Sequence, residues 1–228
     1  MAEHRVKLLS SKFVTHDVKR FIVEKPENYT FTPGQATDVS LGIEGFEDKK
    51  HPFTFTSLNE DKVIEFTIKS YPVKEFPEHK GVTEKLHELM PGEELILQDP
   101  WGTIEYKGKG VFIAGGAGIT PFIAIFRDLH SKGKLAGNKL FFSNKESRDI
   151  ILEKELRYYF GNDLILTLTR EKTDNGYKQG RVDKEMLEAN VDDFGQHFYI
   201  CGPKTMVQDL KDKLSDLGAK SDGVVFEK

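Results

Sequence analysis

Cysteine is almost absent from this chain, which has one in 228 residues. A single cysteine cannot form an internal disulfide, which is typical of proteins in a reducing cytoplasm. It also excludes an internal iron–sulfur cluster held by the usual four thiolates. No apolar run approaches the roughly 20 residues that a membrane helix needs, and the start of the chain lacks the apolar core of a secretory signal. The sequence therefore predicts a cytoplasmic protein without a membrane span.

A strong charge of either sign is missing as well. The formal net charge is -4, with 31% charged and 38% hydrophobic residues. Such a mildly acidic, mixed surface gives no basic stripe for nucleic acid. The composition is that of a globular protein, and the length allows one large domain or two of ordinary size.

The first part of the chain, up to about Tyr106, shows the short alternating pattern of β-strands. Strands are predicted at 21–23, 37–41, 53–56, 63–68 and 94–97. Several short strands at close spacing are typical of a barrel or sandwich. One helix is predicted among them, from Val82 to Met90, with Pro91 and Gly92 ending it.

After Gly108 the hydrophobic period changes. Strands are predicted at 111–114, 139–143, 164–169 and 197–201, and helices at 121–130, 150–160, 184–189 and 205–217. Strands that alternate with helices indicate a parallel sheet covered on both faces. The segment Lys107–Gly110 is the expected junction, which gives domains at 1–106 and 107–228.

Five short motifs follow one another along the chain, namely Phe31–Gln35, His51–Ser57, Gly81–Thr83, Gly115–Pro121 and Cys201–Pro203. In this order they resemble the ferredoxin–NADP reductase superfamily. The His-Pro-Phe-Thr version looks most like the flavin domains of ferric reductases and NADPH oxidases. The resemblance implies an N-terminal antiparallel β-barrel flavin domain and a C-terminal parallel-sheet α/β nicotinamide-binding domain.

The resemblance implies an FAD site around the second motif. In the family, the residue at His51 contacts a flavin phosphate, the aromatic at Phe53 packs beside the isoalloxazine, and the hydroxyl at Thr54 approaches its reactive N5. Pro52 of the same motif and Lys69, at the end of a predicted strand, are assigned to this site with them. Taken alone, aromatic residues on strands are more often plain core, and a His-Pro pair is also compatible with a turn.

Histidine at position 51 departs from the arginine that many members carry. Imidazole has a reference pKa of about 6.5 and cannot make the two-pronged phosphate contact of arginine. Phosphate affinity is therefore expected to depend on backbone donors at the predicted helix start, at Gly81, Val82 and Thr83. In isolation this segment is an ordinary helix start. Tyr71 is a candidate for stacking on an adenine, although a tyrosine at a strand end usually packs in the core.

The fourth motif predicts a strand, a glycine loop and a helix. Gly116, Gly118 and Ile119 form the loop, where glycine lets a pyrophosphate approach backbone amides. Thr120 is expected to cap the helix, and Pro121 suits its first position because its missing N–H costs nothing there. Proline stands where the third glycine of Gly-x-Gly-x-x-Gly would be, which favours the reductase superfamily over a standard dehydrogenase. Alone, the motif is also compatible with a glycine turn of any α/β protein.

The last motif, Cys201-Gly202-Pro203, ends a predicted strand and precedes a helix. Ligands of parallel sheets bind at this end of the strands. The resemblance places the cysteine near the nicotinamide C4 at hydride transfer. Without the Gly-Pro pair, a lone cysteine after an apolar strand is usually a small core residue.

The choice between NADPH and NADH is expected to depend on a 2′-phosphate site. Thr169 and Arg170 resemble the Ser-Arg element of NADP-using members, and Tyr177 and Gln179 resemble their Tyr-x-Gln element. NADPH is therefore the expected donor, with NADH possible. The resemblance also suggests that Phe226 lies over the flavin ring, although it alternates in a terminal strand and is not the last residue.

The favoured function is an NAD(P)H-dependent flavoprotein reductase. Hydride passes from NADPH to FAD, and single electrons then pass to a separate acceptor: a ferredoxin, a flavodoxin, a ferric chelate or an oxygenase component. One alternative is an electron-transfer or regulatory flavoprotein subunit of a larger complex. Another is a flavin-free β-barrel plus α/β protein, for which the histidine at position 51 is the only support.

Overall fold

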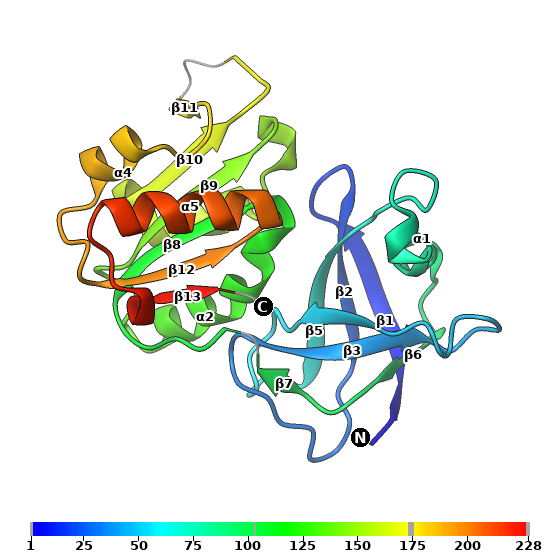
Figure 1. Cartoon of the computed structure of the whole chain (residues 1–228). Helices are drawn as coiled ribbons and strands as arrows, with labels where there is room; N and C mark the ends of the chain where they lie inside the picture. The colour runs from blue at the N-terminus through cyan, green and yellow to red at the C-terminus, as the bar shows by residue number, and fades with distance from the viewer. Residues whose placement is uncertain (1, 103, 173–175, 227–228) are drawn as a thin grey trace. The chain divides into compact units, whose positions relative to one another are not determined.

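The computed structural model describes residues 2–102, 104–172 and 176–226. The chain divides into two compact units, Met1–Gly102 and Thr103–Lys228 (Figure 1). We call the first the barrel unit and the second the sheet unit.

The barrel unit is built from antiparallel strands: β1 (His4–Phe13), β2 (Val18–Glu24), β3 (Gln35–Leu41), β4 (His51–Thr54), β5 (Val63–Lys69), β6 (Glu94–Leu97) and β7 (Trp101–Gly102). The strand order is β4-β3-β6-β1-β2-β5, and β7 pairs with β3. An isolated bridge between Phe55 and Phe66 joins the two ends of this order. The sheet thus nearly closes on itself, and the predicted antiparallel β-barrel is confirmed.

The barrel core lies on the inner faces of these strands. Phe21, Phe55 and Phe66 are fully buried there, and Phe31 stacks on Phe55 with ring centroids 4.0 Å apart. The alternation predicted for β5 places Ile64, Phe66 and Ile68 in this core.

One α-helix belongs to the barrel unit, α1 (Val82–Glu88), which follows the 3₁₀ turn η1 (Pro77–His79). The helix is shorter than predicted because Leu89 already has extended backbone angles, φ -61° and ψ 141°. Leu86 and Leu89 are both buried, so these two apolar side chains still face the core.

The sheet unit contains a parallel sheet in the order β11-β10-β9-β8-β12-β13. Its strands are β8 (Gly110–Gly115), β9 (Lys139–Asn144), β10 (Leu164–Leu168), β11 (Lys178–Gln179), β12 (His197–Cys201) and β13 (Val224–Phe226). The central strand β8 is buried at every position, as expected for a strand covered on both faces.

Helices cover both faces of this sheet, which confirms the predicted α/β layering (Figure 1). They are α2 (Thr120–Ser131), α3 (Glu153–Phe160), α4 (Lys184–Asn190) and α5 (Lys204–Asp216). On one face Leu187 of α4 and Leu210 of α5 pack in one core with Ile113 of β8. On the other face Phe112 makes edge-to-face contacts with Phe122 and Phe126 of α2.

Short 3₁₀ turns connect these elements: η2 (Gly116–Ile119), η3 (Ser147–Asp149), η4 (Gly161–Asp163) and η5 (Ser221–Gly223). Within the described residues, no helix combines the length and apolar character needed to cross a membrane.

Candidate functional site

Strand β4 carries the His-Pro-Phe-Thr motif at one end of the strand order. It pairs with β3, so that Thr54 lies opposite Ala36 and His51 opposite Val39. Phe53 is half-buried against the barrel core, 6.5 Å from the ring of Phe66. Thr54 is 8% exposed, and its hydroxyl is not one of the fully buried polar atoms. A hydroxyl that no described residue binds and that is not sealed in the core is suited to bind a ligand atom.

His51 belongs to a stack of three rings. Its imidazole is parallel to that of His79, with centroids 5.6 Å apart, and His79 stacks on Tyr71 at 4.2 Å. Burial lowers the pKa of His51, and the positive neighbours His79 and Lys80 lower it further. These effects outweigh a hydrogen bond with the His79 backbone and the charge of Asp38, which raise the pKa. Tyr71 thus packs on His79, and burial raises the pKa of its hydroxyl.

Lys69, at the end of β5, forms an ion pair with Asp17, with 2.6 Å between Nζ and Oδ2. Burial alone would raise the pKa of Asp17, but the hydrogen bond and charge of Lys69 lower it below its usual value. The ammonium is thus neutralised by a carboxylate within the barrel unit. Pro52 is exposed on β4, opposite Asp38.

Gly81 precedes α1 in the left-handed conformation, with φ 73°. Glycine takes this conformation at little cost, and a Cβ there would be no closer than 3.8 Å to Val73. Val82 and Thr83 are buried in the first turn. The Thr83 hydroxyl accepts a hydrogen bond from the backbone N–H of Tyr71 at 3.0 Å, so it ties α1 to the loop after β5.

The glycine loop follows β8 as the turn η2 and leads directly into α2. A Cβ on Gly116 would meet no atom within 4 Å, so this side of the loop is open. A Cβ on Gly118 would lie 2.4 Å from the carbonyl oxygen of Cys201, which only glycine avoids. Ile119 is fully buried beneath the loop.

The expected capping role of Thr120 is wrong. Thr120 has helical angles, φ -60° and ψ -39°, because η2 runs into α2 without an extended residue between them. Its hydroxyl therefore donates to the carbonyl of Ala117 at 3.0 Å, instead of accepting from a helix N–H. Pro121 is the second residue of α2 and not the first, because the helix already begins at Thr120.

Cys201 ends β12, beside Ala114 of β8, and is buried without a disulfide bond. Gly202 and Pro203 turn the chain into α5, with Pro203 as the residue before the helix. The Cα and N atoms of Gly115 lie 3.2 Å from the position that a Cβ on Gly202 would take. The two motifs of the sheet unit therefore meet at the carboxyl ends of β8 and β12, where parallel sheets bind ligands.

Thr169 and Arg170 follow β10, two strands away from β8. The Thr169 hydroxyl donates to the carbonyl of Asn144 at 3.2 Å, and the Arg170 N–H to that of Lys145 at 2.9 Å. The Arg170 side chain is exposed, and no ion pair involves it within the described ranges. The backbone of Arg170 is thus held by the end of β9, and its guanidinium is available to bind an anion.

The Tyr177 and Gln179 side chains are held by neighbouring elements. The Tyr177 hydroxyl donates to Glu153 at 2.9 Å, and the guanidinium of Arg157 lies 5.5 Å from the ring centroid. Gln179 donates from Nε2 to the carbonyl of Leu168 at 3.2 Å. One face of the Tyr177 ring is thus covered by Arg157.

Phe226 lies in β13, where it pairs with Ile200 of β12 and packs on the core of the sheet unit. The ammonium of Lys211 lies 4.1 Å from its ring centroid. The ring is therefore engaged by strand and helix residues of its own unit.

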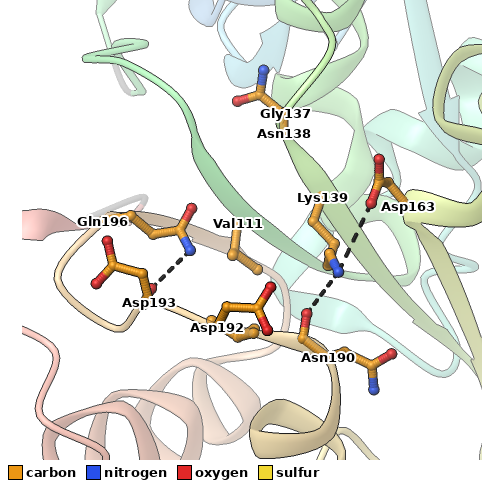
Figure 2. Close-up of a pocket in the computed structure, with 10 residues that line it drawn as sticks. Val111, Gly137, Asn138, Lys139, Asp163, Asn190, Asp192, Asp193 and Gln196 are labelled. Carbon is orange, nitrogen blue, oxygen red and sulfur yellow. Dashed lines mark hydrogen bonds and ion pairs between the residues drawn. The ribbon is translucent and has the colours of Figure 1, made fainter.

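A cavity of about 340 Å³ lies at the opposite end of the parallel strands (Figure 2). Val111 and Lys139, at the starts of β8 and β9, line it together with Asp163 and Asn190. Lys139 donates to the Asn190 carbonyl at 2.6 Å and pairs with Asp163 at 3.8 Å. Dinucleotides bind at the carboxyl ends of such sheets, so this cavity does not belong to the candidate site.

The sequence does not predict several polar residues that lie at these places. His79 stacks between His51 and Tyr71 although its position in the sequence follows no motif. Asn144 ends β9 with both amide atoms buried and without a partner. Hydrogen bonds from the backbone and hydroxyl of Ser147 lower the pKa of Glu171. Only the fold reveals these side chains, since none has a periodic or motif signal.

Each of the two units matches a known domain family. Residues 3–103 match the FAD-binding domain family, and residues 112–212 match the oxidoreductase NAD-binding domain family. The features above fit these cofactors, since the barrel unit offers an unpartnered Thr54 hydroxyl and a positive-φ glycine before α1. The sheet unit offers an open glycine loop beside β12.

Curated relatives cover nearly the whole chain. NADH-cytochrome b5 reductase 3 of Rattus norvegicus is 27% identical over 241 residues, which span 90% of this chain and 80% of the relative. The glycine betaine monooxygenase reductase subunit of Chromohalobacter salexigens is 28% identical over 230 residues, spanning 94% of this chain and 61% of the relative. Among solved structures, a ferredoxin NADP+ reductase from Neisseria gonorrhoeae has the same fold, with a TM-score of 0.82 at 19% identity over 100% of this chain and 98% of that one.

Proposed function

The chain belongs to the ferredoxin–NADP reductase superfamily, and from this premise we propose that it transfers hydride from NADPH to FAD and then single electrons to a separate redox protein. It is a flavin-dependent NAD(P)H oxidoreductase with an FAD-binding and a nicotinamide-binding domain. We assign residues 1–106 to the first and 107–228 to the second. The single cysteine supports a cytoplasmic location.

One observation carries the proposal most strongly, the approach of Gly118 to the carbonyl of Cys201. Two loops that are far apart in sequence meet there without side chains between them. A nicotinamide dinucleotide needs such a surface, because its pyrophosphate must reach backbone N–H groups. Cys201 at the end of β12 is our candidate for seating the nicotinamide ring, together with Gly202 and Pro203. The loop residues Gly116, Ile119, Thr120 and Pro121 complete this dinucleotide site.

The FAD site is proposed to lie along β4 and the start of α1. When bound there, FAD would supply the chemistry of accepting a hydride and passing on single electrons. Thr54 would hold the flavin N5 with its unpartnered hydroxyl, and Phe53 would pack beside the ring. His51 and the backbone of Gly81, Val82 and Thr83 would bind the phosphates. Lys69 would bind the cofactor only after leaving its ion pair with Asp17. Pro52 would lie beside the cofactor on β4.

NADPH is the proposed donor, and NADH is accepted as well. Arg170 supports NADPH, because it is exposed and has no ion pair within the described ranges. Thr169, Tyr177 and Gln179 would complete the 2′-phosphate and adenine site. NADH remains a substrate because removing one phosphate leaves the glycine loop contacts in place. Phe226 is proposed to lie over the flavin ring.

The acceptor is proposed to be a small redox protein, such as a ferredoxin or flavodoxin, or an oxygenase component. The curated relatives include cytochrome b5 reductases and a monooxygenase reductase subunit, which support a separate acceptor protein. This chain has one cysteine and cannot hold a four-thiolate cluster itself. The second candidates are a ferric-chelate reductase and an electron-transfer subunit of a larger complex.

The first experiment is an anaerobic spectral titration of the purified protein. We expect a yellow protein from which FAD is released on denaturation, and bleaching of the flavin band by NADPH and, less efficiently, by NADH. A yellow protein that neither cofactor bleaches would support the regulatory subunit instead. A colourless protein that does not take up FAD would contradict the whole proposal.

The acceptor is tested by stopped-flow oxidation of the reduced flavin across ionic strength. We compare a ferredoxin, a flavodoxin, cytochrome b5 and ferric citrate. Transient electron-transfer contacts are small and steered by charge, so the rate with a protein acceptor should fall as salt rises. A ferric chelate that outcompetes every protein, without a salt effect, would instead identify a small-molecule reductase.

A further inference from the structure

His79 lies in the middle of a ring stack on the barrel unit. Its imidazole is within 5° of parallel to Tyr71 and within 9° of parallel to His51. Phe76 supports the stack from the side, edge-on to Tyr71 at 5.2 Å and to His79 at 6.1 Å. The stack joins β4 to the loop after β5, directly before Gly81 and α1. Packing from three aromatic neighbours fixes the plane of the His79 ring.

One polar atom of this ring lacks a partner. The Nδ1 atom of His79 is buried and makes no hydrogen bond to any described residue. Leaving such a nitrogen unpaired costs about 1–3 kcal/mol, so its place in the stack needs a reason. The side chain is still 26% exposed. A half-turn about the Cβ–Cγ bond keeps the ring in its plane and exchanges the positions of Nδ1 and Cδ2, so it moves Nδ1 to the other edge of the ring without breaking the stack.

The charges around the ring favour an anion. Lys80 is close enough to His51 for its charge to lower the pKa of that imidazole. Of the acidic groups, Asp17 is paired with Lys69, and Asp38 lies opposite Pro52 on β3. Glu78 approaches Nε2 of His79 only to 3.9 Å, with a side chain that is 67% exposed. Burial is the main cause of the lowered pKa of His51, and among the charges around it the contributions of His79 and Lys80 are larger than that of Asp38.

These observations point to an oxyanion that accepts a hydrogen bond from Nδ1. The barrel unit binds FAD, and the anionic groups of FAD are its two phosphates. We propose that His79 is a further FAD-binding residue whose Nδ1–H donates to a phosphate of the cofactor. Histidine at position 51 lacks the fork of arginine, and His79 supplies the second donor beside it. The inference depends on FAD binding but on neither the donor nor the acceptor of electrons.

The test compares variants that keep or remove a donor at this place. His79→Phe keeps a flat ring in the stack and removes both nitrogens. His79→Asn places an amide nitrogen near the position of Nδ1, whereas His79→Gln carries it farther out. Apoprotein of each variant is titrated with FAD, and the 31P spectrum of bound FAD is recorded. His130→Phe, an exposed histidine of the sheet unit, is the matched control.

We expect His79→Phe to weaken FAD binding by about ten- to a hundredfold, the range for a hydrogen bond to a charged group. His79→Asn should retain most of the affinity, and His79→Gln should not. The 31P resonances of bound FAD should move in the Phe variant, while the flavin absorption band and the His130→Phe control stay unchanged.

Three results would overturn the assignment. FAD binding by His79→Phe within about twofold of wild type would leave His79 as a packing residue only. Weaker binding with unchanged 31P resonances would place its effect away from the phosphates. If the Phe variant does not fold, equal FAD affinities of the Asn and Gln variants would contradict an Nδ1 donor. Wild-type protein that binds no FAD would instead contradict the cofactor assignment itself.

Discussion

A Cβ atom on Gly118 would lie 2.4 Å from the carbonyl oxygen of Cys201, closer than any side chain tolerates. The oxygen belongs to the backbone of β12, so it cannot swing away as a flexible side chain would. Gly118 therefore fixes the distance between the glycine loop after β8 and the end of β12. The proposed dinucleotide site depends on this distance, because both loops would form its floor.

Gly118→Ala should separate these two loops. We expect FAD to be retained, because the barrel unit is untouched, while reduction of the flavin by NADPH slows at least tenfold. The protein should also lose about 1–3 kcal/mol of stability, the usual cost of overpacking. Gly223→Ala is the control in the same unit, since its Cβ would come no closer than 3.4 Å to Gln196. Stopped-flow reduction measures the rate, and urea unfolding measures the stability. Equal reduction rates and equal stabilities of the two variants would contradict the role proposed for Gly118.

Cofactor choice should change with Arg170. Replacing it by alanine removes the charged partner proposed for the 2′-phosphate, and a hydrogen bond to a charged group contributes about 1.5–3 kcal/mol. NADPH should bind about ten- to a hundredfold more weakly, whereas NADH should be nearly unaffected. Spectral titrations with both cofactors measure this. Lys220→Ala, which removes an exposed cation before β13 at the amino ends of the strands, should leave both unchanged. If NADPH and NADH binding weaken equally, Arg170 does not bind the 2′-phosphate.

The hydrophobic period was sufficient to predict most elements. Strands β6 and β12 lie at the predicted residues, because each has a short apolar run bounded by polar ends. Strand β1 was not predicted. Its outward face is polar, and an irregularity in its pairing with β2 between Leu8 and Ser10 interrupts the alternation that sequence patterns depend on.

The candidate site was predictable only where a motif marks it. Gly118 and Cys201 carry such motifs, and the structure adds the contact between them. Thr120 had the residue type of a helix cap, but the 3₁₀ turn before it supplied helical backbone and reversed the direction of its hydrogen bond. His79 and Asn144 depend on tertiary neighbours alone, so no local pattern could have identified them.

Thr54 should affect the rate of flavin reduction more than flavin binding. Thr54→Ala removes a positioned hydrogen-bond donor, whose loss typically costs on the order of a hundredfold in rate. We expect the variant to purify with FAD and to be reduced by NADPH about a hundredfold more slowly in stopped-flow experiments. Thr54→Ser keeps the hydroxyl and should restore most of the rate. Reduction of the alanine variant at the wild-type rate would make Thr54 a strand residue only.

The ion pair between Asp17 and Lys69 should give the barrel unit a pH-dependent stability. The folded pKa of Asp17 is lowered relative to its value of 3.8, so the ionised carboxylate stabilises the fold. This contribution is fully present above about pH 5 and is lost as the pH falls through the lowered folded pKa. Asp17→Asn should therefore cost about 1 kcal/mol at pH 7 and at pH 5, and the difference from wild type should shrink below pH 4. Urea unfolding at each pH measures it, with the exposed Asp48→Asn as control. If the difference in unfolding free energy between wild type and Asp17→Asn grows on acidification, the sign of the pKa shift is wrong. Lys69 would then be available to bind the flavin cofactor.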